Sequence, residues 1–339
     1  MIIDRKFWID ALKAICIICV YVYHTGIYYG IDYNFVFVIE PFYVNGFFFI
    51  SGYLFFRSYM KKDRYLKKDY IVSIKNVFFR LVFPTILFSI ILYLPKHYAS
   101  TNGINFIIYT FGGTAFWFTS ALSVAQITFS TMFLSNIKNV WTYTFLSTIL
   151  LVLLNMYGDI RSKEANEYFP WFWQTGLLYM FIMSLGGLYY KYESITFKII
   201  NKPYVISTLL ITYACILLGS LYTPFYFWGL SGKNNFLGIV GTIIAILLLI
   251  YATNKIKKNK IIEFIGKNSI IFYFLSGISP IVVSTITCYL TEKKTYAIYV
   301  LVTIISLLVS SFVSYIISRY LPFIIDLRNL INVSKKNHK

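Results

Sequence analysis

The chain has 339 residues, of which 58% are hydrophobic, 20% aromatic and only 13% charged. Because a soluble domain carries about a quarter charged residues, this composition excludes an ordinary soluble protein. The net charge of +18 does not indicate nucleic-acid binding, because the basic residues lie between the apolar runs, as they do in the loops of a membrane protein.

The apolar runs predict an all-α, polytopic integral membrane protein, since a helix satisfies its own backbone hydrogen bonds in lipid. We predict ten transmembrane helices, at about residues 7–29, 42–58, 73–94, 114–134, 140–156, 171–190, 204–223, 236–253, 268–290 and 297–321. Residues 104–113 fit a re-entrant or interfacial segment. The first run is too long for a cleaved signal and lacks a small-residue cleavage site, so we expect it to stay as the first helix. One membrane domain is expected over 1–339, with a short basic tail from about 322.

The basic residues predict the orientation of these helices. With the N-terminus in the cytoplasm, inner segments carry 24 of the 31 lysines and arginines and outer segments carry 6. This bias predicts both termini in the cytoplasm of a multi-pass protein of the cell membrane. The most basic loop, 57–80, has two interpretations: an anchor on anionic lipid, or an entrance for a phosphorylated cytosolic donor.

The cysteines give no sign of a disulfide framework or of a metal site. They fall within apolar spans and show no metal-ligand spacing, so we interpret them as small core residues: Cys16, Cys19, Cys215 and Cys288.

Asp10, Lys13 and His24 fall within the first predicted span, although a charge in hydrocarbon is costly. Lys13 and His24 are 11 positions apart, so they share one face of a helix. Their separation along the axis is about 16 Å, which is too far for contact. Asp10 and Lys13 are i,i+3 neighbours and can pair.

Two interpretations of His24 stay open at this point. A histidine titrates near neutrality and can act as a general base, or it can hydrogen-bond a neighbouring helix. We expect Tyr21 and Tyr28 to frame its ring, three residues before it and four residues after it. Lys13 taken alone could also extend its amine to the membrane interface.

The segment FWIDALKAICIICVYVYH (7–24) resembles the first-helix signature of a membrane O-acyltransferase family, acyltransferase family 3. In that signature a basic residue precedes a histidine by ten intervening residues, as Lys13 precedes His24 here. The lysine form is most similar to the fucose 4-O-acetylase and polysaccharide O-acetyltransferase branch.

Four later segments resemble further family patterns in the same order, so that the resemblance spans almost the whole chain. They are VNGFFFISGYLF (44–55), KNVFFRLVFP (75–84), FWFTSAL (116–122) and IGKNSIIFYFLS (265–276). Two departures occur. The last pattern often ends in histidine where this chain has Ser276, and the His-Met-Pro run of the fucose acetylase branch is replaced by Tyr43, Val44 and Asn45.

The resemblance implies transfer of an acyl group, usually acetyl from acetyl-CoA, to a hydroxyl of a glycan or lipid-linked sugar. The products in such bacterial systems are modified O-antigens, capsules, exopolysaccharides or nodulation factors. Acyl-CoA is then a co-substrate and no bound cofactor is expected. The expected partners are acyl-CoA, the sugar acceptor and membrane lipids but not nucleic acid, and a homo-oligomer is left open.

The resemblance also implies roles for single residues. His24 is the expected general base. Cations suited to the phosphates of the donor are Lys13, Arg80 and Lys75. By family position, Ser51, Asn268 and Ser269 are candidates for the oxyanion donors, while Asp10 and Trp117 are expected to support the site. The alternative interpretation of Ser51, Asn268 and Ser269 is interhelical hydrogen bonding or close packing. The alternative for Trp117 is a packing or interfacial aromatic. Direct transfer and an acyl-histidine relay both stay open.

Two other classes of function fit the same sequence. A transporter or flippase for a glycan would suit ten spans without a soluble domain, although ion coupling usually needs paired acidic sites in the membrane. A non-catalytic subunit of a synthase is the other alternative.

Overall fold

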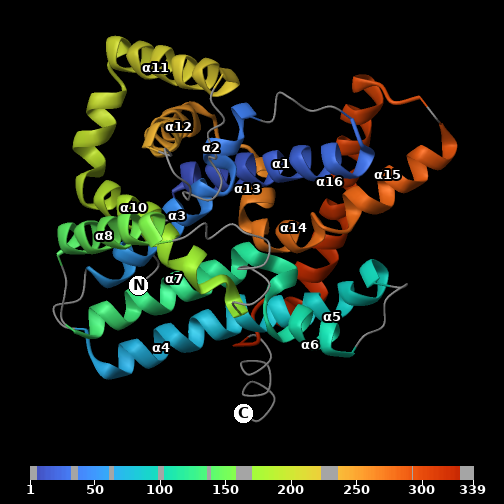
Figure 1. The fold of residues 1–339 in the computed structure, drawn as a ribbon, viewed down its shortest axis with the longest axis horizontal. Coiled ribbons are helices and arrows are strands. Elements are labelled where there is room, and N and C mark those ends of the chain that lie inside the picture. The colour runs from blue at the N-terminus through green and yellow to red at the C-terminus, as the bar shows by residue number, and fades with distance from the viewer. Residues whose placement is uncertain are drawn as a thin grey trace. The chain divides into compact units, whose positions relative to one another are not determined.

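The computed structural model describes residues 6–31, 37–60, 65–97, 103–135, 139–157, 170–222, 236–291 and 293–328. Within these ranges every regular element is a helix (Figure 1), so the all-α prediction is confirmed. The α-helices are α1 (Phe7–Tyr29), α2 (Glu40–Tyr43), α3 (Asn45–Tyr59), α4 (Lys67–Val77), α5 (Phe83–His97), α6 (Gly103–Phe111), α7 (Trp117–Leu134), α8 (Val140–Tyr157), α10 (Trp173–Ile200), α11 (Pro203–Tyr222), α12 (Phe236–Lys255), α13 (Lys260–Lys267), α14 (Ser269–Leu275), α15 (Ser279–Leu290) and α16 (Tyr296–Tyr320). Short turns of other helix types are η2 (Phe78–Val82), η3 (Thr114–Phe116), η4 (Pro170–Phe172) and η5 (Pro322–Ile324).

Several of these helices have the length and composition of membrane spans. Within the described ranges, five pass this test, and a sixth does if the bent pair of α14 and α15 counts as one span. The five are Phe7–Tyr29, Lys67–Leu92, Pro203–Ser220, Phe236–Lys255 and Tyr296–Tyr320. The protein is therefore a helical, multi-pass membrane protein, and the count of ten spans stays a prediction.

The chain forms two compact units. Unit 1 comprises Met1–Phe47, Phe197–Trp228 and Leu237–Tyr320, and unit 2 comprises Phe48–Thr196, Gly229–Phe236 and Leu321–Lys339.

Helix α1 is central to unit 1, where it packs against α2, α13, α14, α15 and α16. Its approach to α13 is close because Gly266 has no side chain: a Cβ there would lie 2.1 Å from the carbonyl oxygen of Asp10. Hydrogen bonds join α1 to the C-terminal helices as well. The Tyr21 hydroxyl lies 2.6 Å from Ser310 Oγ and 3.0 Å from the carbonyl oxygen of Phe272. Interhelical hydroxyl contacts of this kind stabilise bundles in lipid.

Unit 2 is held by glycine contacts and by an aromatic core. Helices α3 and α10 touch backbone to backbone, because a Cβ on Gly52 would lie 1.9 Å from Met183 O and one on Gly186 would lie 2.0 Å from Phe49 O. Phe48 stacks on Tyr179 with ring centroids 4.1 Å apart. A second group of buried rings joins α3, α7 and α8: Phe56, Phe129, Phe133 and Tyr143.

Two of the predicted spans are interrupted well inside their length, which the apolar pattern does not show. The run 268–290 is two helices, Ser269–Leu275 and Ser279–Leu290, bent by 44°. Pro280 lies in the first turn of the second helix, where a missing N–H is tolerated, so the proline suits a fresh start. In the run 73–94, η2 is a π-helical turn in which the Phe83 N–H donates to Phe78 O. Pro84 has no N–H to donate to Arg80 O, four residues earlier. This explains why π-helical hydrogen bonds replace the regular α-helical pattern here.

Candidate functional site

Helix α1 runs without interruption from Phe7 to Tyr29, the predicted range, and carries Asp10, Lys13 and His24. It ends where Gly30 adopts φ +69°, a left-handed conformation that glycine adopts without strain, and the Gly30 N–H donates to Gly26 O at 3.1 Å. Asp10 is buried, while Lys13 and His24 are each half-buried. One rigid element thus fixes the spacing of the predicted cation and the predicted base.

The His24 ring lies among tyrosines. Tyr28 stacks on it with ring centroids 5.9 Å apart and planes 11° apart, as predicted for the neighbour one turn later. Tyr23 meets it edge-on at 5.6 Å and in turn lies 5.7 Å from the ring of Tyr43. Tyr21, the other predicted neighbour, directs its hydroxyl to α14 and α16. Tyr43 stands where the fucose acetylase pattern has its histidine. The residue that departs from that pattern thus contacts Tyr23, which in turn contacts His24.

Asn268 and Ser269 lie in the same unit as α1, at the junction of α13 and α14. The Asn268 side chain donates to Phe264 O at 2.9 Å, and its backbone oxygen accepts from Ile271 N at 2.9 Å. Asn268 therefore closes one helix and opens the next. With Gly266 packed on the Asp10 backbone, the start of the segment IGKNSIIFYFLS has a structural role in packing this turn against α1.

Ser51 and Trp117 belong to unit 2. Ser51 is half-buried and immediately precedes Gly52, the glycine that touches the backbone of α10. Trp117 is the first residue of α7, and its ring lies 6.2 Å from that of Tyr179. These contacts place both residues in the packing of unit 2.

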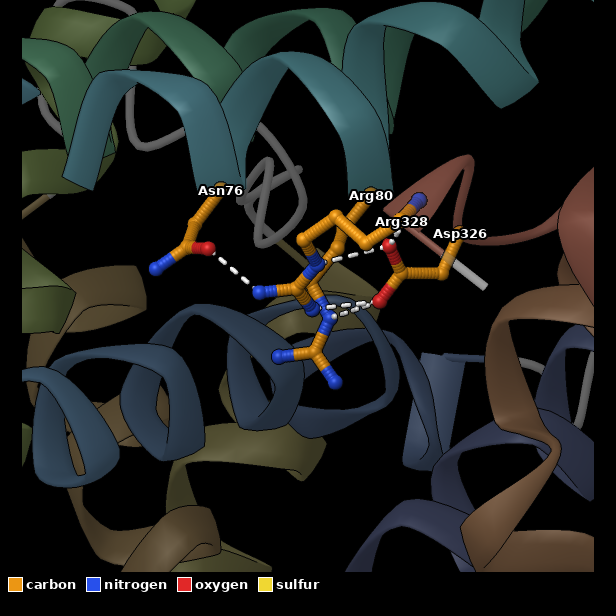
Figure 2. Close-up of polar contacts among 4 residues, drawn as sticks. All are labelled: Asn76, Arg80, Asp326 and Arg328. Carbon is orange, nitrogen blue, oxygen red and sulfur yellow. Dashed lines mark hydrogen bonds and ion pairs between the residues drawn. The ribbon is translucent and has the colours of Figure 1, made fainter. Parts of the chain in front are cut away.

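Lys75 and Arg80 also belong to unit 2, and both are exposed. Arg80 lies within the π-helical turn, an irregularity that is frequent at functional sites. Its Nε lies 3.3 Å from Asp326 Oδ2 (Figure 2). Asp326 also accepts from Arg328 Nε at 2.7 Å, and Arg328 reaches Asn76 on α4.

Sequence reasoning missed Asn76, Asp326 and Arg328. No local pattern indicates that Asn76, inside the KNVFFRLVFP segment, and Asp326, in a basic tail, belong to one cluster. We interpreted the tail only as positive charge that sets the orientation in the membrane.

Asp326 is ionised in this arrangement. Burial raises the pKa of its carboxyl, but the hydrogen bonds and charge of Arg328, with a further contribution from Arg80, lower the pKa overall below its usual range. The same hydrogen bonding with Asp326 raises the pKa of Arg328. The cluster therefore holds two guanidinium cations and one carboxylate.

The predicted residues divide between the two units. Unit 1 contains Asp10, Lys13, His24, Asn268 and Ser269, whereas unit 2 contains Ser51, Lys75, Arg80 and Trp117. In the parts of the chain that the structure describes, no group of three or more His, Cys, Asp or Glu side chains could hold a metal ion.

Comparison with known proteins identifies the family. A family model described as an acyltransferase domain, that of acyltransferase family 3, matches residues 6–319 and thus crosses both units. Comparison with curated proteins gave no match, and neither did comparison with solved structures. Because the family model covers nearly the whole chain, including the helix of Lys13 and His24, the chain belongs to acyltransferase family 3.

Proposed function

We propose that this membrane acyltransferase moves an acetyl group from acetyl-CoA to a hydroxyl of a cell-surface glycan or lipid-linked sugar. In this proposal the chain crosses the cell membrane ten times with both termini in the cytoplasm, the compartment that contains acetyl-CoA. His24 is the general base, and positive charge for the phosphates of the donor comes from Lys13, Lys75 and Arg80.

The observation that carries the proposal is the unbroken helix α1. A straight helix separates Lys13 from His24 by about 16 Å along one face, a distance similar to the length of the thin pantetheine arm of CoA. A donor whose phosphates lie near Lys13 can therefore extend its thioester toward His24. The rings of Tyr23 and Tyr28 restrict the orientation of the imidazole and so support its use as a base.

The proposed step is direct transfer. The neutral imidazole of His24 removes the proton of the acceptor hydroxyl while the hydroxyl oxygen attacks the thioester carbonyl carbon. The resulting tetrahedral intermediate collapses as the carbon–sulfur bond breaks, and the imidazolium returns its proton to the sulfur of CoA. Ser51, Asn268 and Ser269 stay candidates for donors to the oxyanion, Asp10 stays the proposed partner of Lys13, and Trp117 the proposed support of the site.

The test is acetyl transfer by the purified chain. With radiolabelled acetyl-CoA and total surface glycan as acceptor, the wild-type chain should form a glycan ester, and His24→Ala should lower the rate by about 10²–10⁴-fold, the usual contribution of a positioned base. His97→Ala is the matched control, since it removes the other histidine that precedes the tail, and should transfer at the wild-type rate. Thermal unfolding of each variant checks that it is folded.

The acceptor is identified by comparing surface glycans from cells with and without the chain by mass spectrometry and NMR. Loss of one ester group would identify the modified sugar. Loss of the whole glycan from the surface, with normal ester content in the glycan retained by the cell, would contradict the proposal and favour an exporter. An unchanged transfer rate in His24→Ala would refute the role of this histidine.

A further inference from the structure

A chain of polar contacts ties the segment after α16 to the π-helical turn of Arg80, all within unit 2. Figure 2 shows its four members: Asn76 on α4, Arg80 on η2, and Asp326 and Arg328 beyond η5. Arg328 donates through Nε and a terminal nitrogen to the two oxygens of Asp326, and through its other terminal nitrogen to Asn76 Oδ1. Asp326 then contacts Arg80 Nε. We name these four residues the tail clamp.

The two arginines of the clamp differ in what they offer a ligand. Arg328 has all three guanidinium nitrogens engaged, and its side chain is 34% exposed. Arg80 is 64% exposed and meets Asp326 through Nε alone, while its two terminal nitrogens point away from that carboxylate (Figure 2). Those terminal nitrogens can form the paired hydrogen bonds that a guanidinium makes with a phosphate.

The charges of the clamp leave Arg80 cationic. Asp326 alone beside Arg80 would form a neutral pair and could take up both of its terminal nitrogens. Arg328 prevents this because it binds both oxygens of Asp326, so that two positive charges face one negative charge. The carboxylate can orient Arg80 through Nε and leave the other end of the guanidinium available.

The geometry points to Asp326 as a positioning residue for the acyl donor: held by Arg328, which Asn76 anchors in turn, it aims the terminal nitrogens of Arg80 at a phosphate of CoA. This inference deepens the proposed function and rests on it for the identity of the ligand. Asp326 and Arg328 lie beyond residue 319, where the match to the family model ends. Arg80 lies within the match, so residues outside the family domain position a cation inside it.

The experiment compares ligands with and without phosphate. Calorimetry on the full-length chain in detergent gives the dissociation constants of CoA and of pantetheine, which lacks every phosphate. In Asp326→Asn the ratio of CoA to pantetheine affinity should fall about tenfold, the size expected for loss of one charge-assisted hydrogen bond. Arg328→Gln should lower the ratio to a similar extent. Arg319→Gln, a matched loss of an exposed arginine on the last turn of α16, should keep the wild-type ratio.

The asparagine variant separates positioning from simple attraction. Asp326→Asn raises the local charge by one unit, so attraction alone predicts tighter CoA binding, whereas positioning predicts weaker binding. A misfolded fraction lowers the measured binding of both ligands alike and leaves their ratio unchanged. A wild-type ratio or a higher ratio in Asp326→Asn would overturn the inference.

A lipid headgroup offers the same phosphate chemistry, so a second arm tests that source. Wild type and Arg80→Gln are reconstituted in vesicles of phosphatidylcholine with or without phosphatidylglycerol. If phosphatidylglycerol raises the unfolding temperature of the wild type only, and the CoA ratio is the same in both chains, the clamp serves lipid and the inference is wrong. The two proposals can also fail separately. If the clamp variants change the ratio of CoA to pantetheine affinity but the wild-type chain transfers no acetyl group, the proposed function is overturned and donor positioning remains supported.

Discussion

The rings of His24 and Tyr28 lie nearly parallel one helical turn apart, with centroids 5.9 Å from each other. Tyr21, the third member of the predicted group, instead makes its polar contacts with Ser310 and the backbone of Phe272. The three residues share one helix, but the two tyrosines differ in role. Tyr28 stacks on the candidate base, whereas the hydroxyl of Tyr21 joins α1 to α14 and α16.

This separation predicts opposite effects for two tyrosines. Tyr28→Leu should lower the acetyl-transfer rate roughly two- to tenfold, because an aromatic pair contributes about 0.5–1.5 kcal/mol to holding a ring in place. Tyr28→Phe keeps the ring and should keep most of the activity. Tyr21→Phe should lower the free energy of unfolding by about 0.6–1.7 kcal/mol, the range of interhelical hydrogen bonds in lipid, and leave the rate of folded chain unchanged. Equal loss of rate in Tyr21→Phe and Tyr28→Leu would contradict the assignment.

Lys13 should affect donor binding more than chemistry. Lys13→Ala is expected to raise KM for acetyl-CoA about tenfold with a smaller change in kcat, because a charge-assisted contact to phosphate is lost. Lys13→Arg should stay close to wild type, since arginine also binds phosphate. Steady-state kinetics at fixed acceptor concentration measures both, with Lys258→Ala as the exposed control. An alanine variant with normal KM would rule out the donor role.

Two glycines are predicted to be essential for packing. In Gly52→Ala and Gly266→Ala the new methyl group would meet backbone oxygens at 1.9 and 2.1 Å, and backbone cannot move aside cheaply. Each should lose about 1–3 kcal/mol of unfolding free energy. Gly46→Ala is the comparison, because its nearest neighbour is the Cys16 side chain at 2.6 Å, which can rotate. Unfolding in detergent should rank Gly46→Ala as the mildest of the three.

The ionisation of Asp326 predicts how the clamp depends on pH. The pKa of Asp326 is lower in the folded chain than in the unfolded chain. Its contribution to the free energy of unfolding is therefore complete above about pH 4 and is lost as the pH falls through the pKa of the folded chain. The ratio of CoA affinity between wild type and Asp326→Asn should therefore be flat between about pH 5 and 8. A change of acetyl-transfer rate over that interval would then report another group, for which His24 is the candidate. A ratio that moves with pH in this interval would contradict the ionised carboxylate.

The orientation of the chain can be tested at two exposed lysines. Lys68 lies in the basic segment that we place in the cytoplasm, and Lys293 lies between α15 and α16, which we place outside. In intact cells a membrane-impermeant maleimide should label Lys293→Cys above the background of the native cysteines and should label Lys68→Cys only after permeabilisation. The reverse pattern would invert the proposed topology.

The long helices were predictable from sequence because their signal is local. The span 7–29 is a largely apolar run followed by Gly30, and both of its limits match α1. The same is true of the run 297–321, which corresponds to Tyr296–Tyr320. Apolar length and helix-ending residues act within a few turns, so one sequence suffices to locate them.

The irregular turns and the clamp could not be predicted in this way. Pro84 marks a disturbance, but a proline can produce a kink, a stop or a π-helical turn, and the choice depends on which carbonyl finds a donor. The contact between Arg328 and Asn76 joins residues 252 positions apart, and no local pattern of charge records such a pair. Asp326 therefore looked like an ordinary tail residue until the fold brought it to Arg80.

That long-range contact also orders events during biosynthesis. At translation rates of roughly 5–20 residues per second, the ribosome needs roughly 13–50 s to add the 252 positions between Asn76 and Arg328. The helix that carries Arg80 is therefore made well before the residues that secure its guanidinium. A nascent chain that has not yet reached Arg328, or a chain truncated before it, thus has an untethered Arg80, and the arrangement in Figure 2 forms only after Arg328 has been added.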